Sequence, residues 1–307
     1  VWFCSLAGGL GVRLETSRSR RGALAMNGIF VWASAALANV RVAAEIPDIN
    51  SQVLRPSLSS ERLMFTAEAA TFADGFFSAA MTQYTDTPII YRFHSGKSED
   101  LIAQLVQSNI FAGYTYAGYQ MTVGIPLYLQ STGLAGQERG LGDLQVGVKK
   151  SFTDGSFDPL GSAIQLEMEI PTATLQAPLG HAGVAWDINL ILDKDFGPTK
   201  RCGFRSFCNQ FRGALNLGHA GIPKDNLENL QWGSRFFIKG GLGILLSKRW
   251  GAGLEGSFHA IYKDYENTAG RPLELTTVVF GELGDHWRIR ISSGKGMNEG
   301  IGSPVFR

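Results

Sequence analysis

The stretch "GSRFFIKGGLGILLSKRWGAGLEGSFHAIY", from Gly233 to Tyr262, decides the fold. It holds the G-x-G-x-x-G spacing of a dinucleotide-binding turn at Gly251, Gly253 and Gly256. Such a turn needs a helix after the glycines, because the helix N-terminus binds the pyrophosphate. The residues that follow, "SFHAIYKDY", instead alternate apolar and polar side chains. Alternation with period two indicates β-structure, so the stretch predicts two strands joined at Ser247–Trp250 and no nucleotide site.

The same alternation recurs from about Phe76 to the end of the chain. In "SAIQLEMEI", for example, Ile164 and Leu166 fall on one face of a strand, and Gln165 and Glu167 on the other. The pattern predicts about twelve strands, the even number that bacterial barrels require, with the last one truncated at its end. They are expected to begin near Phe76, Leu101, Gln120, Gly142, Ser162, Gly183, Phe211, Ser234, Gly251, Pro272, His286 and Pro304.

The composition fits a membrane barrel better than a soluble protein. The chain has 307 residues, 18% of them charged, a net charge of +1 and 38 glycines. Soluble domains average ~25% charged residues. The sequence offers no run of the ~20 apolar residues that a membrane-spanning helix needs. The balanced charge also gives no reason to expect nucleic acid as a partner.

Alternation alone does not say which face of the strands lies inside. A soluble sandwich buries its apolar face, whereas a transmembrane barrel turns that face to lipid and encloses a polar lumen. Short links alternate with longer ones along this chain, and Trp232, Trp250, Tyr262 and Trp287 lie near strand ends, as in aromatic girdles. We therefore predict an all-β fold, a transmembrane antiparallel β-barrel over residues 76–307. A secreted soluble β-sandwich that binds a ligand is the alternative.

The N-terminal part resembles an export signal. Arg18, Arg20 and Arg21 precede the apolar run "GALAMNGIFVWASAALA", and "VAAE" places Val42 and Ala44 before a cleavage position. We expect residues 1–44 to be an upstream segment with a signal peptide, and residues 45–75 to be a periplasmic N-terminal segment. An N-terminal amphipathic helix packed on the domain is the alternative.

Export also bears on the cysteines. Cys202 and Cys208 lie between two expected strands, in "KRCGFRSFCNQ". In an oxidising periplasm such a pair is expected to form a disulfide. The alternative, half of a metal site, lacks a second pair and a nearby histidine.

The two faces of the strands assign side chains to the lumen or to lipid. The expected lumen-facing residues are Asp143, Gln145, Lys149, Gln165, Glu167, Glu169, Asp187, Asn189, Lys239, Glu255, Arg288 and Arg290. The expected lipid-facing residues are Val123, Ile125, Val146, Val148, Leu166, Ile188, Ile289 and Ile291.

These inward charges predict structure rather than catalysis. Glu167 and Glu169 lie two apart on one face, as a carboxylate pair could. Acid–base catalysis needs two carboxyl groups in distinct environments across a substrate, whereas here many acids and bases share one lumen. We interpret them as a network of cross-strand ion pairs. The five histidines show no ligand spacing and no G-x-S-x-G motif is present, so we expect no enzyme, no cofactor and no metal.

Several stretches resemble the OmpA family of envelope proteins over about residues 48–307. They are "DINSQVLRPSLSS", "YTDTPIIYRF", "GLGDLQVGVK", "EIPTATLQAPLG", "ILDKDFGP" and "GIGSPVFR". The resemblance implies an outer-membrane barrel in a Gram-negative bacterium, with outer-membrane lipid as a partner. It also implies peptidoglycan as a partner through a wall-binding domain that has no counterpart in this chain.

From these features we expect a non-enzymatic envelope protein of OmpA-like type, with a structural role and passive passage of small solutes. A porin or a hydrophobic-solute transporter is the alternative within membrane proteins.

Overall fold

The protein is an all-β barrel. The computed structural model describes residues 11–17, 55–57, 62–92, 98–133, 136–174, 180–181, 183–196, 210–223, 225–227, 230–247, 249–264, 270–284, 287–298, 304 and 306–307. Within these residues the regular structure consists of strands and one 3₁₀ turn, η2 (Tyr262–Asp264). None of the described residues forms a helix long and apolar enough to cross a membrane.

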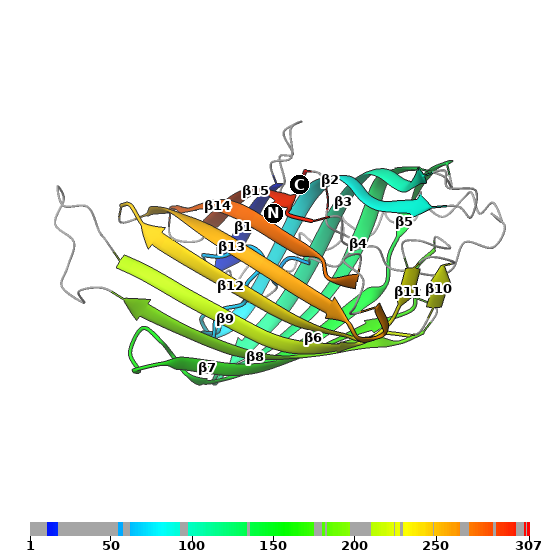
Figure 1. Cartoon of the computed structure of the whole chain (residues 1–307). Helices are drawn as coiled ribbons and strands as arrows, with labels where there is room; N and C mark the ends of the chain where they lie inside the picture. The colour runs from blue at the N-terminus through cyan, green and yellow to red at the C-terminus, as the bar shows by residue number, and fades with distance from the viewer. Residues whose placement is uncertain are drawn as a thin grey trace.

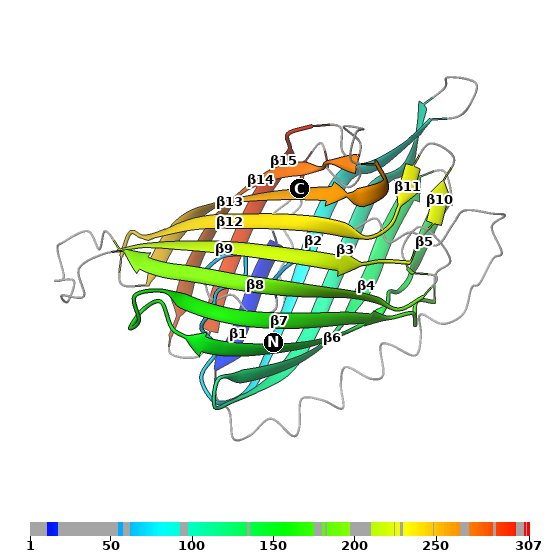
Figure 2. The same cartoon turned by 60° about the horizontal axis from the view of Figure 1, so that its bottom comes forward.

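Twelve antiparallel strands follow one another around a ring (Figures 1 and 2). The order is β3-β2-β1-β15-β14-β13-β12-β9-β8-β7-β6-β4, and a β3–β4 pairing closes it. This confirms the predicted all-β barrel and the number of its strands. The strands are β1 (Gly11–Ser17), β2 (Gly75–Arg92), β3 (Ser98–Tyr116), β4 (Tyr119–Gly133), β6 (Leu144–Thr153), β7 (Gly161–Ile170), β8 (Ala185–Phe196), β9 (Gln210–Gly221), β12 (Arg235–Leu245), β13 (Trp250–Ile261), β14 (Leu273–Leu283) and β15 (Trp287–Gly296).

The two ends of the barrel differ. The end where β2 begins, here the proximal end, carries tight links such as Ala117–Gly118 between β3 and β4. Both residues of this link have positive φ, the geometry of a type I′ hairpin turn. The opposite, distal end carries β5 (Gly136–Leu141), which extends from β4, and the hairpin of β10 (Asp225–Leu227) and β11 (Leu230–Trp232), on the right of Figure 1.

The closing strand differs from the prediction. The sequence placed it at Pro304. In the structure, the gap between β15 and β2 is filled by β1 at its proximal part and by Pro304, Phe306 and Arg307 at its distal part. Strand β1 pairs with β15 from Gly11↔Ser292 to Thr16↔Trp287. Arg307 exchanges two backbone hydrogen bonds of 2.8 Å with Gly294. The edge of β15 needs hydrogen-bond partners along its length, and residues 11–17, expected in an upstream segment, supply most of them.

Burial alternates along the strands with period two. In β7, Gln165 is 5% exposed and its neighbour Leu166 is 44% exposed. In β8, Asn189 is 6% exposed and Ile188 is 42% exposed. The polar faces therefore line the inside of the ring and the apolar faces lie outside, the reverse of a soluble core.

Residues 62–70, part of the predicted N-terminal segment, lie inside the barrel. The sequence assigned residues 45–75 to a periplasmic segment ahead of the barrel, but residues 62–70 are surrounded by its strands, and Met64, Thr66 and Glu68 have no exposed surface. We call residues 62–70 the plug. Its contacts with the wall, described next, supply the partners that a buried backbone requires.

Candidate functional site

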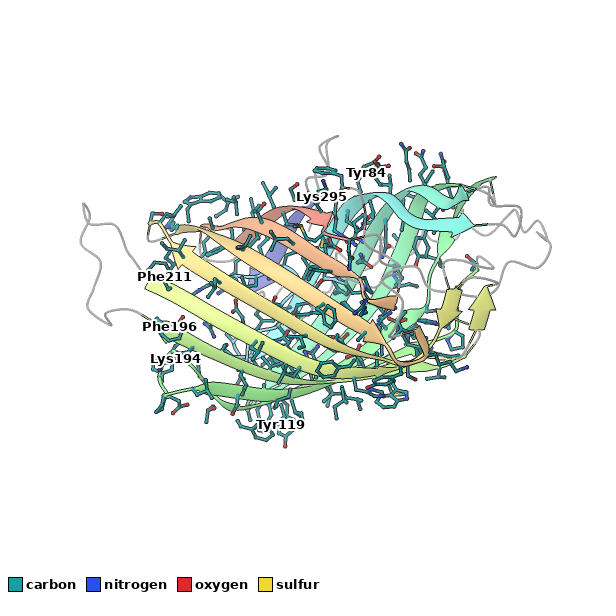
Figure 3. All side chains as sticks on the ribbon, in the orientation of Figure 1. Tyr84, Tyr119, Lys194, Phe196, Phe211 and Lys295 are labelled. Atoms are coloured by element: carbon teal, nitrogen blue, oxygen red, sulfur yellow. The ribbon has the colours of Figure 1, made fainter. Side chains whose placement is uncertain are left out.

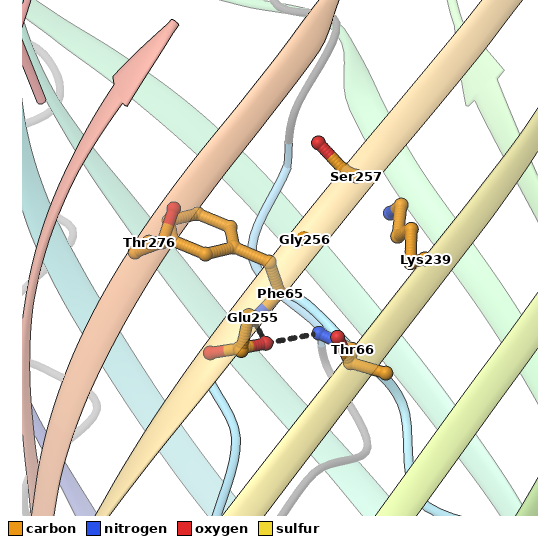
Figure 4. Close-up of a pocket in the computed structure, with 7 residues that line it drawn as sticks. All are labelled: Phe65, Thr66, Lys239, Glu255, Gly256, Ser257 and Thr276. Atoms are coloured by element: carbon orange, nitrogen blue, oxygen red, sulfur yellow. Dashed lines mark hydrogen bonds between the residues drawn. The ribbon is translucent and has the colours of Figure 1, made fainter. Parts of the chain in front are cut away.

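The plug and the wall around it form the candidate site. The plug is not a strand, so its backbone groups need partners other than a neighbouring ladder. Wall side chains supply them, and they come from β6, β8, β9, β13 and β15. Figure 4 shows Phe65 and Thr66 of the plug beside Glu255 of β13.

Glu255 binds three consecutive plug amides. The N–H groups of Met64, Phe65 and Thr66 donate to its carboxylate oxygens at 2.7, 2.8 and 2.7 Å. Hydrogen bonds to a charged group contribute ~1.5–3 kcal/mol, about twice a neutral bond. A buried carboxylate is costly unless such donors surround it, so Glu255 and the plug depend on each other.

Asn216 and Asp193 bind the next residues. The Asn216 side chain accepts from the Ala67 N–H at 2.7 Å and donates to the Ala67 carbonyl at 2.9 Å. The Asp193 carboxylate accepts from the Ala69 N–H at 2.8 Å. Five plug amides are thus satisfied by wall side chains.

Cations bind the plug carbonyls. Lys149 of β6 donates to the carbonyls of Glu68 and Ala70, at 3.0 and 2.6 Å. Arg290 of β15 donates to the carbonyl of Leu63. Both cations are almost fully buried, and peptide carbonyls supply part of the partner set that a buried charge requires.

A recess in the wall receives the Leu63 side chain. Gly241 and Gly243 of β12 and Gly253 of β13 lie beneath it. A Cβ at Gly241 would lie 2.5 Å from the Leu63 Cδ1, and one at Gly253 3.3 Å from the Cδ2. Two wall glycines thus permit the close approach, and Gly253, from the G-x-G-x-x-G spacing, lies on a continuous strand.

Glu68 anchors the plug to a buried ion network. Its carboxylate accepts from the N–H groups of Arg62 and Leu63, at 3.0 and 3.3 Å. The Arg212 Nε lies 3.9 Å from Glu68, and the Arg212 Nη2 lies 2.6 Å from Asp193. Burial alone would raise the pKa of Glu68, but Arg212, Arg62 and the backbone donor outweigh it, so the pKa is lower than its ordinary value.

Toward the distal end, the inward carboxylates of Asp143 and Glu169 contact residues outside the plug. Glu169 forms an ion pair with Arg55, and the His181 Nε2 lies 3.1 Å from its carboxylate. The Asp143 carboxylate accepts from the backbone N–H groups of Thr172, Ala173 and His181.

A small pocket lies between the plug and the wall. It is drawn in Figure 4, is lined by residues that include Lys239, Ser257 and Thr276, and has no measurable volume open to a water molecule. Ligand pockets typically measure ~300–1,000 Å³, so this pocket is too small for a ligand of that kind.

The structure uses the residues expected in the lumen in three ways. Lys149, Glu255 and Arg290 contact the plug. Arg288 lies at the proximal rim, 3.6 Å from Glu282. The other eight also lie on the inner face. They are Asp143, Gln145, Gln165, Glu167, Glu169, Asp187, Asn189 and Lys239.

The residues expected to face lipid lie on the outer face of their strands. Val123, Val148, Leu166 and Ile188 are exposed, whereas the rest are partly covered by neighbouring side chains. The partly covered ones are Ile125, Val146, Ile289 and Ile291. Whether lipid surrounds this face stays a prediction.

Sequence reasoning missed Asn216, Asp193, Arg212 and Glu68. Asp193 continues the alternation of Asp187, Asn189 and Ile191 along β8, so extending that strand would have found it. Arg212 and Asn216 alternate with Ala214 and Gly218 in β9, where small inward residues weaken the pattern. Glu68 lies outside the strands and had no periodic signal.

The remaining site predictions concern metals and disulfides. Among the described residues, no group of three or more His, Cys, Asp or Glu side chains could hold a metal ion. Cys202 and Cys208 lie outside the described residues. The predicted signal peptide also lies outside them, whereas residues 11–17, which precede it, form β1.

Comparisons with known proteins do not identify a family. No protein-family model matches the chain, and no curated protein matches it. The resemblance to the OmpA family therefore stays a prediction, and function has to be argued from the barrel and its plug.

Proposed function

We propose that this protein is a β-barrel of the outer membrane of Gram-negative bacteria, with a structural role in the envelope and little passage of solutes. The observation that carries the proposal is the reversed distribution of side chains. Buried Lys149, Glu255 and Arg290 line the inside, and the exposed outer face carries Leu166, Ile188 and residues like them. Water would disfavour such a surface, whereas hydrocarbon favours it.

The height of the apolar band supports the membrane. On β8 the outward residues are Trp186, Ile188, Leu190, Leu192, Lys194 and Phe196, so the face is apolar except for one lysine near its proximal border. At ~3.3 Å per residue and a tilt of ~40°, this length spans about 25 Å, the height of the apolar band of outer-membrane barrels.

Aromatic residues mark both borders of this band. Phe196, Phe211 and Tyr119 point outward at the proximal end in Figure 3, and Trp186 and Tyr262 are exposed toward the distal end. Girdles of this kind lie at the two membrane–water interfaces.

The plug favours a structural role for the barrel rather than the role of an open pore. It occupies the lumen between β6, β9 and β13, and its backbone is tied to all three strands. A porin instead keeps a water-filled channel.

Fractionation tests the membrane location. The chain, expressed in a Gram-negative host with a cleavable export signal, should sediment with the outer membrane and leave the pellet only in detergent. A protein found in the soluble periplasmic fraction would favour the secreted binding protein instead.

Conductance in planar bilayers tests the role. Rare, small openings are expected from a plugged barrel. Steady, large openings would overturn the structural role and favour a porin.

A further inference from the structure

The wall recognises the plug mainly through its main chain. The groups that it binds are the N–H groups of five plug residues and the carbonyls of four. Every peptide carries these groups. The wall therefore has a surface that fits a peptide main chain in the bent conformation of the plug.

The chemistry of the wall side chains matches the peptide dipole. Acceptors, the oxygens of Glu255, Asn216 and Asp193, face N–H groups, and donors, from Lys149 and Arg290, face carbonyls. The matching groups come from five strands, so their arrangement belongs to the barrel and not to the plug. Charge-assisted hydrogen bonds of this kind are the strong ones.

Two plug side chains add sequence preference. Leu63 fills the recess over Gly241 and Gly253, and Glu68 lies beside Arg212. Most of the residues after Phe65, such as Ala67 and Ala69, are small. The preferred peptide thus has a leucine and, five residues later, an acid.

We propose that the inner wall is a binding site for a short peptide in this bent conformation, and that the plug occupies it as an intramolecular ligand. A separate peptide with the same backbone and the same two side chains binds there once the plug is removed. The inference goes beyond the proposed function, because binding in detergent does not depend on where the barrel is located or on what it conducts.

The test uses the full chain with residues 62–70 replaced by a Gly/Ser linker of equal length. Circular dichroism and heat-modifiable gel migration establish that this variant is folded. A fluorescein-labelled peptide with the sequence of residues 62–72 is added in detergent, and its anisotropy is measured. We expect saturable binding at least tenfold tighter than to the unaltered protein. There the tethered plug competes at an effective concentration of ~mM.

Modified peptides separate main-chain recognition from hydrophobic adhesion. A peptide N-methylated at the positions of Phe65 and Thr66 loses two of the three donors to Glu255 and should bind at least tenfold more weakly. Equal binding of the methylated and unmethylated peptides would overturn the proposal, and so would the absence of saturable binding to the folded variant.

A second variant keeps the test open if the linker variant does not fold. Glu68→Arg places a cation beside Arg212 and should release the plug by a single substitution. It should bind the same unmethylated peptide at least tenfold more tightly than the unaltered protein does, and binding no tighter than that would overturn the proposal.

Discussion

At the scale of single residues, one carboxylate carries much of the contact between plug and wall. Glu255 accepts three amides, and none of those amides has another hydrogen-bond partner among the described residues. Removing its charge should therefore affect three bonds at once.

Glu255→Gln should lower the free energy of unfolding by on the order of 2 kcal/mol, because the amide has one acceptor oxygen and no charge. Urea unfolding in detergent measures this change. Hydrogen exchange should also quicken at Met64, Phe65 and Thr66. Ser257→Ala, two residues along the same face, is the control and should leave those three amides protected.

Glu68 makes the plug sensitive to acid. Its pKa is lower in the folded protein than in the unfolded chain, so its stabilisation is complete above the ordinary value of 4.5 and is lost as the pH falls through the folded pKa. The free energies of unfolding of the parent and of Glu68→Gln should differ at pH 6 and converge as the pH falls below about 4.5. A difference that stays constant down to pH 3 would show that the charge of Glu68 does not stabilise the fold.

At the scale of elements, two adjacent glycines of strand β12 face opposite sides of the barrel wall. Gly241 faces the plug, whereas its neighbour Gly240 faces outward, where an added Cβ would meet only a carbonyl oxygen at 3.9 Å. These adjacent glycines differ in surroundings and therefore form a matched pair.

Gly241→Val should displace Leu63 and lower the free energy of unfolding by about 2 kcal/mol, the usual cost of overpacking. Gly240→Val should change it by less than about 0.5 kcal/mol, as most surface substitutions do. Bilayer recordings should show larger openings for Gly241→Val alone. Equal conductance of the two variants would mean that Leu63 does not help to close the lumen.

At the scale of the whole molecule, the outer face tests the membrane proposal. Leu190 lies near the middle of the apolar band and is exposed, whereas Gln145 faces the lumen beside Glu169. A cation placed at the first position meets hydrocarbon if the barrel spans a membrane, and one placed at the second meets a carboxylate.

Leu190→Arg should therefore cost about 2–4 kcal/mol in folding into lipid vesicles, and Gln145→Arg much less. Refolding at a series of urea concentrations measures both. If the two variants lost the same stability, the assignment of the outer face to lipid would fail.

The sequence by itself determined the strands and their two faces. Alternation is a local property, so "SAIQLEMEI" predicts a strand near Ser162 and the structure begins β7 at Gly161. The same reasoning found Lys149, Glu255 and Arg290 on the inner face, because a side chain's face follows from its position in the period.

Only the tertiary structure decided what the barrel contains and how it closes. The plug has no periodic pattern, and its bond from Thr66 to Glu255 joins residues 189 positions apart, so no local signal announces it. The closing strand was misplaced for a related reason. The edge of β15 accepts backbone from any suitable segment, and whether β1 or Pro304, Phe306 and Arg307 lie there depends on how distant parts of the chain meet in space.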